Sequence, residues 1–95
     1  MAVGVQLDFN GATLEQYDEV VKKMGFTPGG RGAPGGLFHC VTKTPDGIRV
    51  VDVWQSREVF EKFSHEKIEP ITREVGFTGP PDVQLFEVHN YLTAG

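Results

Sequence analysis

The chain has 95 residues and a net charge of −4, and 39% of its residues are hydrophobic and 23% charged. This length and composition are typical of one folded domain over residues 1–95, and they exclude disordered and fibrous proteins. Because no cluster of Lys and Arg stands out, we expect neither nucleic acid nor a membrane surface as a partner. No apolar run approaches the ~20 residues of a membrane span and the start does not resemble a signal peptide, so we expect a cytoplasmic protein.

The first expected elements are a strand and a helix. Residues 2–9 alternate apolar side chains with small or polar ones, which is the period of a strand with one apolar face. Thr13, followed three residues later by Gln16, has the spacing of a helix capping box. We expect the helix to end at Gly25 in a left-handed conformation. Its apolar stripe comprises Leu14, Tyr17, Val20, Val21 and Met24.

A loop rich in Gly and Pro follows over residues 27–36. It comes after a helix and before a strand, the reverse of the order in phosphate-binding loops, and it lacks their Gly-Lys-Ser/Thr. We therefore interpret it as a flexible crossing or a lid, and the sequence leaves open whether residues 28–36 close over a ligand.

Two expected strands, residues 36–43 and 48–55, flank a turn with the sequence Thr-Pro-Asp-Gly. This turn predicts an antiparallel hairpin with Gly47 in a left-handed bulge position. The chain's single cysteine, Cys40, excludes an internal disulfide and a multi-cysteine zinc site. Its place in a strand predicts a small buried hydrophobe.

The pairing register of this hairpin decides which polar side chains meet. If Thr44 pairs with Ile48, His39 lies beside Val53, on the face opposite to Asp52. A shift by one residue instead pairs His39 with Asp52. The sequence leaves both registers open.

A second helix is expected after its N-cap, Ser56. Its apolar stripe lapses after Phe63, and Pro70 suits the first turn of a new helical piece, so we expect a break at residues 65–69. Gly76 and the two prolines after it end the helix, and residues 83–92 alternate as a last strand.

Nearly the same helix ending occurs twice in the sequence, as MGFTPGG at residues 24–30 and VGFTGPP at residues 75–81. Each ending leads from a helix into a strand that contains a Leu-Phe pair. This repeat and the order of elements predict an α+β, ferredoxin-like β-α-β-β-α-β fold with a four-stranded antiparallel sheet.

Three of the four expected strands carry bulky apolar residues on both faces, yet two helices cover only one face of such a sheet. A second copy of the chain, packed sheet to sheet, would cover the other face. We therefore expect a homodimer through the sheet faces.

The order of elements, together with residues 47–63 (GIRVVDVWQSREVFEKF), resembles the dimeric α+β barrel superfamily over nearly the whole chain. This superfamily includes antibiotic-biosynthesis monooxygenase-like domains. The resemblance implies a ligand between helices and sheet, and activities that include cofactor-free oxygenation, haem degradation and isomerisation.

Two functional signatures of this superfamily are missing. Monooxygenase-type members often place a His three positions after the aromatic that matches Phe60, where this chain has Phe63. Haem-degrading members have a Trp there and a His ten residues later, where this chain has Phe63 and Arg73. Haem degradation is therefore not expected, and no cofactor or metal is predicted.

The candidate catalytic residues are His39, Asp52 and His65. An imidazole titrates near neutrality, and a carboxylate between two valines is costly to bury unpaired. A structural role remains open for each. His39 is alternatively a satisfied histidine of the core or of the dimer interface, Asp52 a partner for Arg49 or a histidine, and His65 a solvated histidine at a helix end. His89 is expected at an edge or interface.

The candidate ligand-binding residues are Tyr17, Phe38, Trp54 and Phe63, which alternatively belong to the core. The hypothesis that follows is a homodimer that binds a small apolar or aromatic molecule, as a cofactor-independent monooxygenase or an isomerase. The alternative is a non-catalytic dimeric domain that binds a ligand or a protein.

Overall fold

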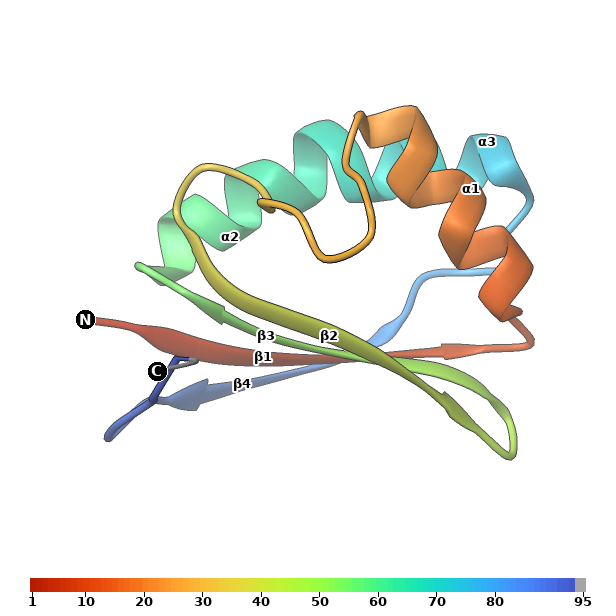
Figure 1. Ribbon diagram of the computed structural model, residues 1–95. Coiled ribbons are helices and arrows are strands. Elements are labelled where there is room, and N and C mark those ends of the chain that lie inside the picture. Colours follow the sequence, from red (N-terminus) through yellow and green to blue (C-terminus); the bar gives the residue numbers. More distant parts are fainter. Residues whose placement is uncertain (94–95) are drawn as a thin grey trace.

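A computed structural model describes residues 1–93 and shows a four-stranded antiparallel sheet with helices on one face (Figure 1). In chain order the elements are β1 (Val3–Asn10), α1 (Leu14–Met24), β2 (Gly36–Thr44), β3 (Gly47–Trp54), α2 (Arg57–Phe63), the π-helical segment η1 (Ser64–Ile68), α3 (Glu69–Val75) and β4 (Asp82–Glu87). The strand order is β2-β3-β1-β4. The ferredoxin-like fold predicted from the sequence is thus confirmed. Within residues 1–93, no helix is long and apolar enough to cross a membrane.

The core lies between the sheet and the helices. On β1 every second side chain is buried, as its alternation predicts. The helices contribute Val20 of α1, Phe60 of α2 and Ile68 of η1. The buried apolar side chains of the strands are Val3, Val5, Leu7, Phe9, Ile48, Val50 and Trp54.

The repeated helix ending is a repeated C-cap. Gly25 and Gly76 both have positive φ angles, 84° and 106°, as a left-handed cap requires. The next residue in each case donates its N–H to the carbonyl five residues earlier, at 3.0 Å for Phe26 and 2.9 Å for Phe77. Both phenylalanines then pack against the core, so the repeat turns the chain from each helix back to the sheet.

The hairpin adopts the second of the two registers, in which Thr44 pairs with Gly47 and His39 pairs with Asp52. The expected left-handed conformation of Gly47 is wrong, because its φ is not positive. Glycine is required there for space, since a Cβ atom would overlap the carbonyl oxygen of Phe9 on β1.

The expected break in the second helix is a widening of the helix. Helical structure continues from α2 through η1 into α3, and Glu69 donates its N–H to the carbonyl of Ser64, five residues earlier. Pro70 has no N–H to donate, and a π-helical turn shifts the bonding pattern at this point without ending the helix.

Within residues 1–93, no helix covers the second face of the sheet (Figure 1). Phe38 of β2 and Phe86 of β4 are 46% and 49% exposed there. Cys40 is also exposed, which corrects the expectation of a buried thiol. The register is the reason, because it turns His39 toward the helices and therefore turns Cys40 away from them. The last strand ends at Glu87, earlier than expected.

Candidate functional site

A polar cluster lies on the covered face of the sheet, where α1 passes over β2 and β3. Tyr17 belongs to the apolar stripe of α1 and therefore points down toward the sheet. His39 and Asp52 are cross-strand partners, so their side chains stand on the same face. Trp54 follows Asp52 by two residues and shares that face.

Hydrogen bonds join these four side chains in a row, which we call the relay. The hydroxyl of Tyr17 bonds to Nε2 of His39. Nδ1 of His39 lies 2.6 Å from Oδ1 of Asp52, and Nε1 of Trp54 donates to Oδ2 of Asp52 at 3.1 Å. The rings of Tyr17 and His39 are nearly parallel, at 9°. Elements far apart in the sequence thus place four side chains in one continuous chain.

The relay runs from the interior to the surface. Asp52 is only 3% exposed, whereas the side chain of His39 is 45% exposed. A buried carboxylate is stable only when donors satisfy its oxygens, and here each oxygen has one. The buried end therefore carries a compensated charge, and the open end presents an imidazole and a phenol.

The pKa of Tyr17 is raised above its ordinary value, first because the hydroxyl is partly buried and next because the Asp52 carboxylate is close. The phenol therefore keeps its proton at neutral pH and acts as a hydrogen-bond donor toward His39. If the proton is removed, the phenolate that remains is a stronger base than a free tyrosine.

The hydrogen-bond partners assign the tautomer of His39. An ionised carboxylate only accepts hydrogen bonds, so Nδ1 of His39 carries the proton that points at Asp52. Nε2 then has a free lone pair, which accepts the hydroxyl of Tyr17. This arrangement can take a proton at the surface and stabilise the resulting imidazolium from the buried side.

Aromatic rings border the buried end of the relay. The ring of Trp54 lies 5.1 Å from that of Phe63 and 5.8 Å from that of Phe60, measured between centroids. The Gly-rich loop ends beside these rings, where Gln55 donates its N–H to the carbonyl of Gly35. Ala33 in the same loop is buried, so this part of the loop is anchored to the core.

Two of the predicted site residues lie away from the relay. Phe38 stands on the uncovered face of the sheet, because it alternates with His39 along β2. The side chain of His65 is 83% exposed on η1, where Nδ1 lies 3.8 Å from Oε2 of Glu69. The structure thus brings together five of the predicted site residues: Tyr17, His39, Asp52 and Trp54 in the relay, and Phe63 beside Trp54.

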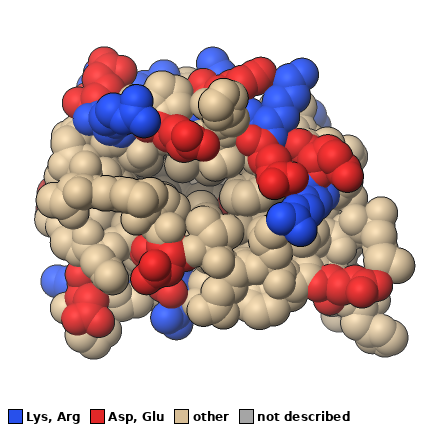
Figure 2. Space-filling model, turned by 180° about the vertical axis from the view of Figure 1, so that it is seen from behind, with Lys and Arg blue, Asp and Glu red and all other residues tan. Residues whose placement is uncertain are grey.

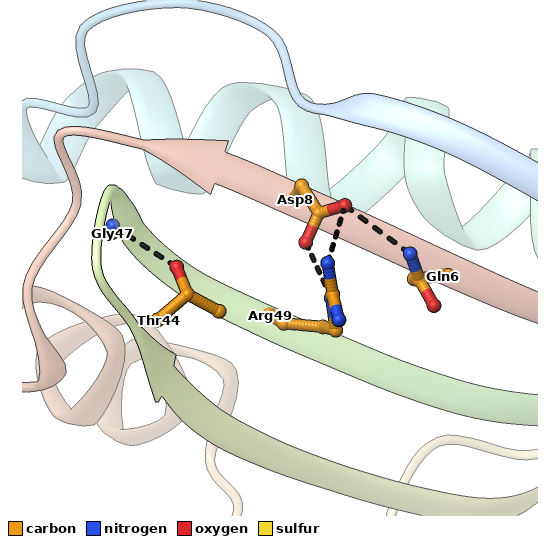
Figure 3. Close-up of polar contacts among 5 residues, drawn as sticks. All are labelled: Gln6, Asp8, Thr44, Gly47 and Arg49. Atoms are coloured by element: carbon orange, nitrogen blue, oxygen red, sulfur yellow. Dashed lines mark hydrogen bonds and ion pairs between the residues drawn. The ribbon is translucent and has the colours of Figure 1, made fainter.

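A second polar cluster on the uncovered face was not predicted (Figure 3). Nε of Arg49 donates to Oδ1 of Asp8 at 2.7 Å, and Gln6 donates to Oδ2 of Asp8 at 3.2 Å. This pairing lowers the pKa of Asp8, mainly through the hydrogen bond from Arg49. It also corrects the suggestion that Arg49 is a partner of Asp52. The order of strands would have revealed the contact, because Asp8 and Arg49 are cross-strand partners.

Two surface hollows lie away from the relay. One of about 290 Å³ lies between the start of α1 and the β2–β3 turn, where Thr44 accepts the N–H of Gly47 (Figure 3). Another of about 350 Å³ lies beside Met1 and residues 87–89, including His89. The relay itself reaches the surface at the side chain of His39.

The face behind the view of Figure 1 carries charged side chains of both signs toward its rim, with mostly uncharged residues in the middle (Figure 2). This face offers no basic patch of the kind that binds a phosphate backbone. Among residues 1–93, no group of three His, Cys, Asp or Glu side chains is arranged to hold a metal ion.

No protein-family model and no curated protein matches the sequence. Solved structures match in fold. A mutant of SnoaB, a cofactor-independent oxygenase from Streptomyces nogalater, is 14% identical with a TM-score of 0.58, covering 98% of this chain and 96% of that one. The monooxygenase ActVA-Orf6 of Streptomyces coelicolor, in complex with nanaomycin D, is 21% identical with a TM-score of 0.53, covering 99% and 92%.

A candidate antibiotic biosynthesis monooxygenase from Deinococcus radiodurans is 11% identical with a TM-score of 0.52, covering 100% of this chain and 99% of that one. Likenesses at such low identity concern the fold alone. They confirm the ferredoxin-like fold of the chain.

Proposed function

We propose that the chain binds a small apolar or aromatic molecule at the open end of the relay and moves a proton on it, as a cofactor-independent monooxygenase or an isomerase. The observation that carries this proposal is the continuous row of hydrogen bonds from buried Asp52 through His39 to the hydroxyl of Tyr17. Such a row is the arrangement by which a carboxylate and an imidazole activate a hydroxyl group.

In the proposed reaction, Tyr17 touches the substrate. An acidic O–H or C–H of the substrate gives its proton to Oη of Tyr17, while Tyr17 passes its own proton to Nε2 of His39. The raised pKa of Tyr17 makes its oxygen a strong base at that moment. Asp52 stabilises the imidazolium that forms, because its carboxylate faces Nδ1 at 2.6 Å.

The substrate anion then has two fates. In an isomerase, the relay returns the proton to another atom of the substrate. In a monooxygenase, the anion reacts with O₂, so that a CH₂ group and O₂ give a carbonyl group and water. The electrons in that reaction come from the substrate, which is why no bound cofactor is required.

The structural neighbours support this chemistry by likeness of fold. SnoaB is described as a cofactor-independent oxygenase, and ActVA-Orf6 is a monooxygenase that holds nanaomycin D. In the present chain, Trp54 and Phe63 pack against each other at the buried end of the relay, with ring centroids 5.1 Å apart. His65 and Phe38 lie outside the relay and are not needed for the proposed proton transfer.

We further propose that the working form is a homodimer packed through the uncovered sheet faces. Phe38 and Phe86 are about half exposed on that face, and Val51 and Val53 of β3 lie between their strands. Exposed apolar surface of this kind is typical of an interface.

The alternative function is a non-catalytic domain that binds a ligand or a protein. Two observations favour it: two surface hollows lie away from the relay, and Phe63 occupies the position where monooxygenase-type members of the superfamily often have a His. In that case the relay is a satisfied polar element of the core.

The test measures thermal midpoints with naphthol, naphthoquinone, a small lactone and nanaomycin D, for the wild type and for His39→Gln and Asp52→Asn. Asp8→Asn is the matched control, because its carboxylate lies on the opposite face of the sheet. Proton abstraction is measured with nitrobenzisoxazole, a small aromatic compound that opens to a coloured phenolate when a base removes its ring proton.

The proposal expects a ligand that raises the midpoint of the wild type and of Asp8→Asn, and abstraction that His39→Gln and Asp52→Asn abolish. Oxygen uptake with that ligand identifies a monooxygenase, and deuterium exchange without uptake identifies an isomerase. A ligand that stabilises all variants equally, without abstraction, establishes the non-catalytic alternative. No stabilising ligand and no abstraction would reject the proposed function.

A further inference from the structure

Trp54 contacts Asp52 on the carboxylate oxygen that His39 does not use. Nε1 of Trp54 donates to Oδ2 at 3.1 Å, while Oδ1 faces Nδ1 of His39 at 2.6 Å. The side chain of Asp52 is 4% exposed, so no bulk water replaces either donor. Among residues 1–93, no buried side-chain N or O atom lacks a hydrogen-bond partner. Both oxygens of the carboxylate are therefore held by protein groups.

The indole of Trp54 is a fixed donor. Its N–H only donates and does not titrate, so Oδ2 of Asp52 is the acceptor in this hydrogen bond at every pH. The ring is held by Phe60 and Phe63 and lies against Gly36 on the paired strand, where a Cβ atom would be 3.6 Å from the indole. A donor held in this way fixes the rotation of the carboxylate.

We propose that Trp54 is a positioning residue whose N–H fixes the Asp52 carboxylate and thereby keeps the proton of neutral His39 on Nδ1. This inference deepens the proposed function, on which its kinetic consequence rests. The tautomer of His39 is a property of the resting protein and can be measured whether or not the chain is an enzyme.

Without the indole N–H, Oδ2 of Asp52 is a buried oxygen without a donor. The carboxylate then rotates or takes up a proton, and its bond to Nδ1 of His39 weakens. The other tautomer, with the proton on Nε2, donates to the oxygen of Tyr17 and no longer accepts from it. The direction of the relay is then reversed, and Tyr17 has no group to which it can pass its proton.

The experiment replaces the indole N–H by sulfur. Trp54 is the only tryptophan in the chain, so growth on benzothienylalanine changes this one residue and keeps its shape. NMR of the histidine side chains then reports whether Nδ1 or Nε2 carries the proton, with His39→Gln to identify the signals of His39. Phe60→Leu is the control for packing, because it disturbs the same ring and removes no hydrogen bond.

In the wild type and in Phe60→Leu, we expect the proton of His39 on Nδ1. In the sulfur-substituted protein, we expect the Nε2 form to appear and the abstraction rate with nitrobenzisoxazole to fall roughly 10- to 100-fold, with KM little changed. An unchanged tautomer in the sulfur-substituted protein would overturn the inference. If the wild type abstracts no proton, the proposed function fails, and the tautomer alone decides the role of Trp54.

Discussion

His39 and Asp52 are directly opposite each other on β2 and β3, with Nδ1 of His39 2.6 Å from Oδ1 of Asp52. The pairing of two strands therefore sets this distance, and the backbone hydrogen bonds of the sheet hold it. Tyr17 lies on a different element, α1, and its hydroxyl bonds to Nε2 of His39 at the end of the row. A rigid pair on the sheet and a third group on a helix are suited to a site in which only the outer group adjusts to a ligand.

Asp52→Asn tests the buried end of the relay. The amide is nearly the same size but neutral, and its NH₂ group cannot accept a hydrogen bond from either neighbour. We expect a loss of about 1–3 kcal/mol in the free energy of unfolding, because one buried donor is left without an acceptor. Urea denaturation measures this loss. A variant as stable as the wild type would mean that the carboxylate is not needed for its two bonds.

Tyr17→Phe tests the raised pKa of Tyr17. Since the folded pKa lies above the unfolded value of about 10, the folded state holds this proton more tightly. The stability that results is complete below about pH 10 and is lost as the pH rises through the folded pKa. Ultraviolet titration of the phenols should show a component in the wild type that ionises above about pH 10 and is missing in Tyr17→Phe. Loss of only an ordinary component would contradict the assignment.

The ion pair of Asp8 and Arg49 predicts a response to acid. The folded pKa of Asp8 is lowered, so its contribution to stability is present above the unfolded value of about 3.9 and is lost as the pH falls below it. We expect Asp8→Asn to reduce the difference between the thermal midpoints measured at neutral and acid pH. Asp18→Asn is the control, because Asp18 is an exposed residue of α1. An equal reduction by both variants would mean that the ion pair of Asp8 is not the cause of the response to acid.

Much of the fold was predictable because it depends on local signals. The caps at Thr13, Gly25 and Gly76 and the alternation of β1 each act within a few residues. The site depended on one quantity that local signals do not determine, the register of the hairpin. A shift by one residue would have placed His39 and Asp52 on opposite faces, and both registers suit the same turn sequence.

The errors have related causes. The exposure of Cys40 follows from the register, and the space requirement of Gly47 comes from β1, which lies far away in the sequence. The contact between Asp8 and Arg49 likewise depends on which strands are neighbours. The link from Trp54 to Asp52 was readable in principle, because residues two apart in a strand share a face.

The proposed dimer predicts that a charge on the uncovered face separates the two copies. Phe86→Asp places a carboxylate on the edge strand β4 within the proposed interface, where burial without a partner is costly. We expect a dimer for the wild type and a monomer for the variant in analytical ultracentrifugation. Leu14→Asp is the matched control, since this exposed leucine lies on α1 and not on the sheet. A wild type that is monomeric at all concentrations would reject the sheet-face dimer.

Two glycine-to-alanine variants distinguish the cost of a left-handed backbone conformation from the cost of a steric clash. Gly25 has a φ of 84°, and a Cβ atom on it would meet no other atom within 4 Å, so Gly25→Ala should cost only the left-handed conformation, about 1 kcal/mol. Gly47 has an ordinary φ, but a Cβ atom would overlap the carbonyl oxygen of Phe9, so β1 and β3 must move apart. We expect Gly47→Ala to cost more, about 2–3 kcal/mol. Urea denaturation of both variants measures the order, and a larger loss for Gly25→Ala would contradict the close approach of the two strands.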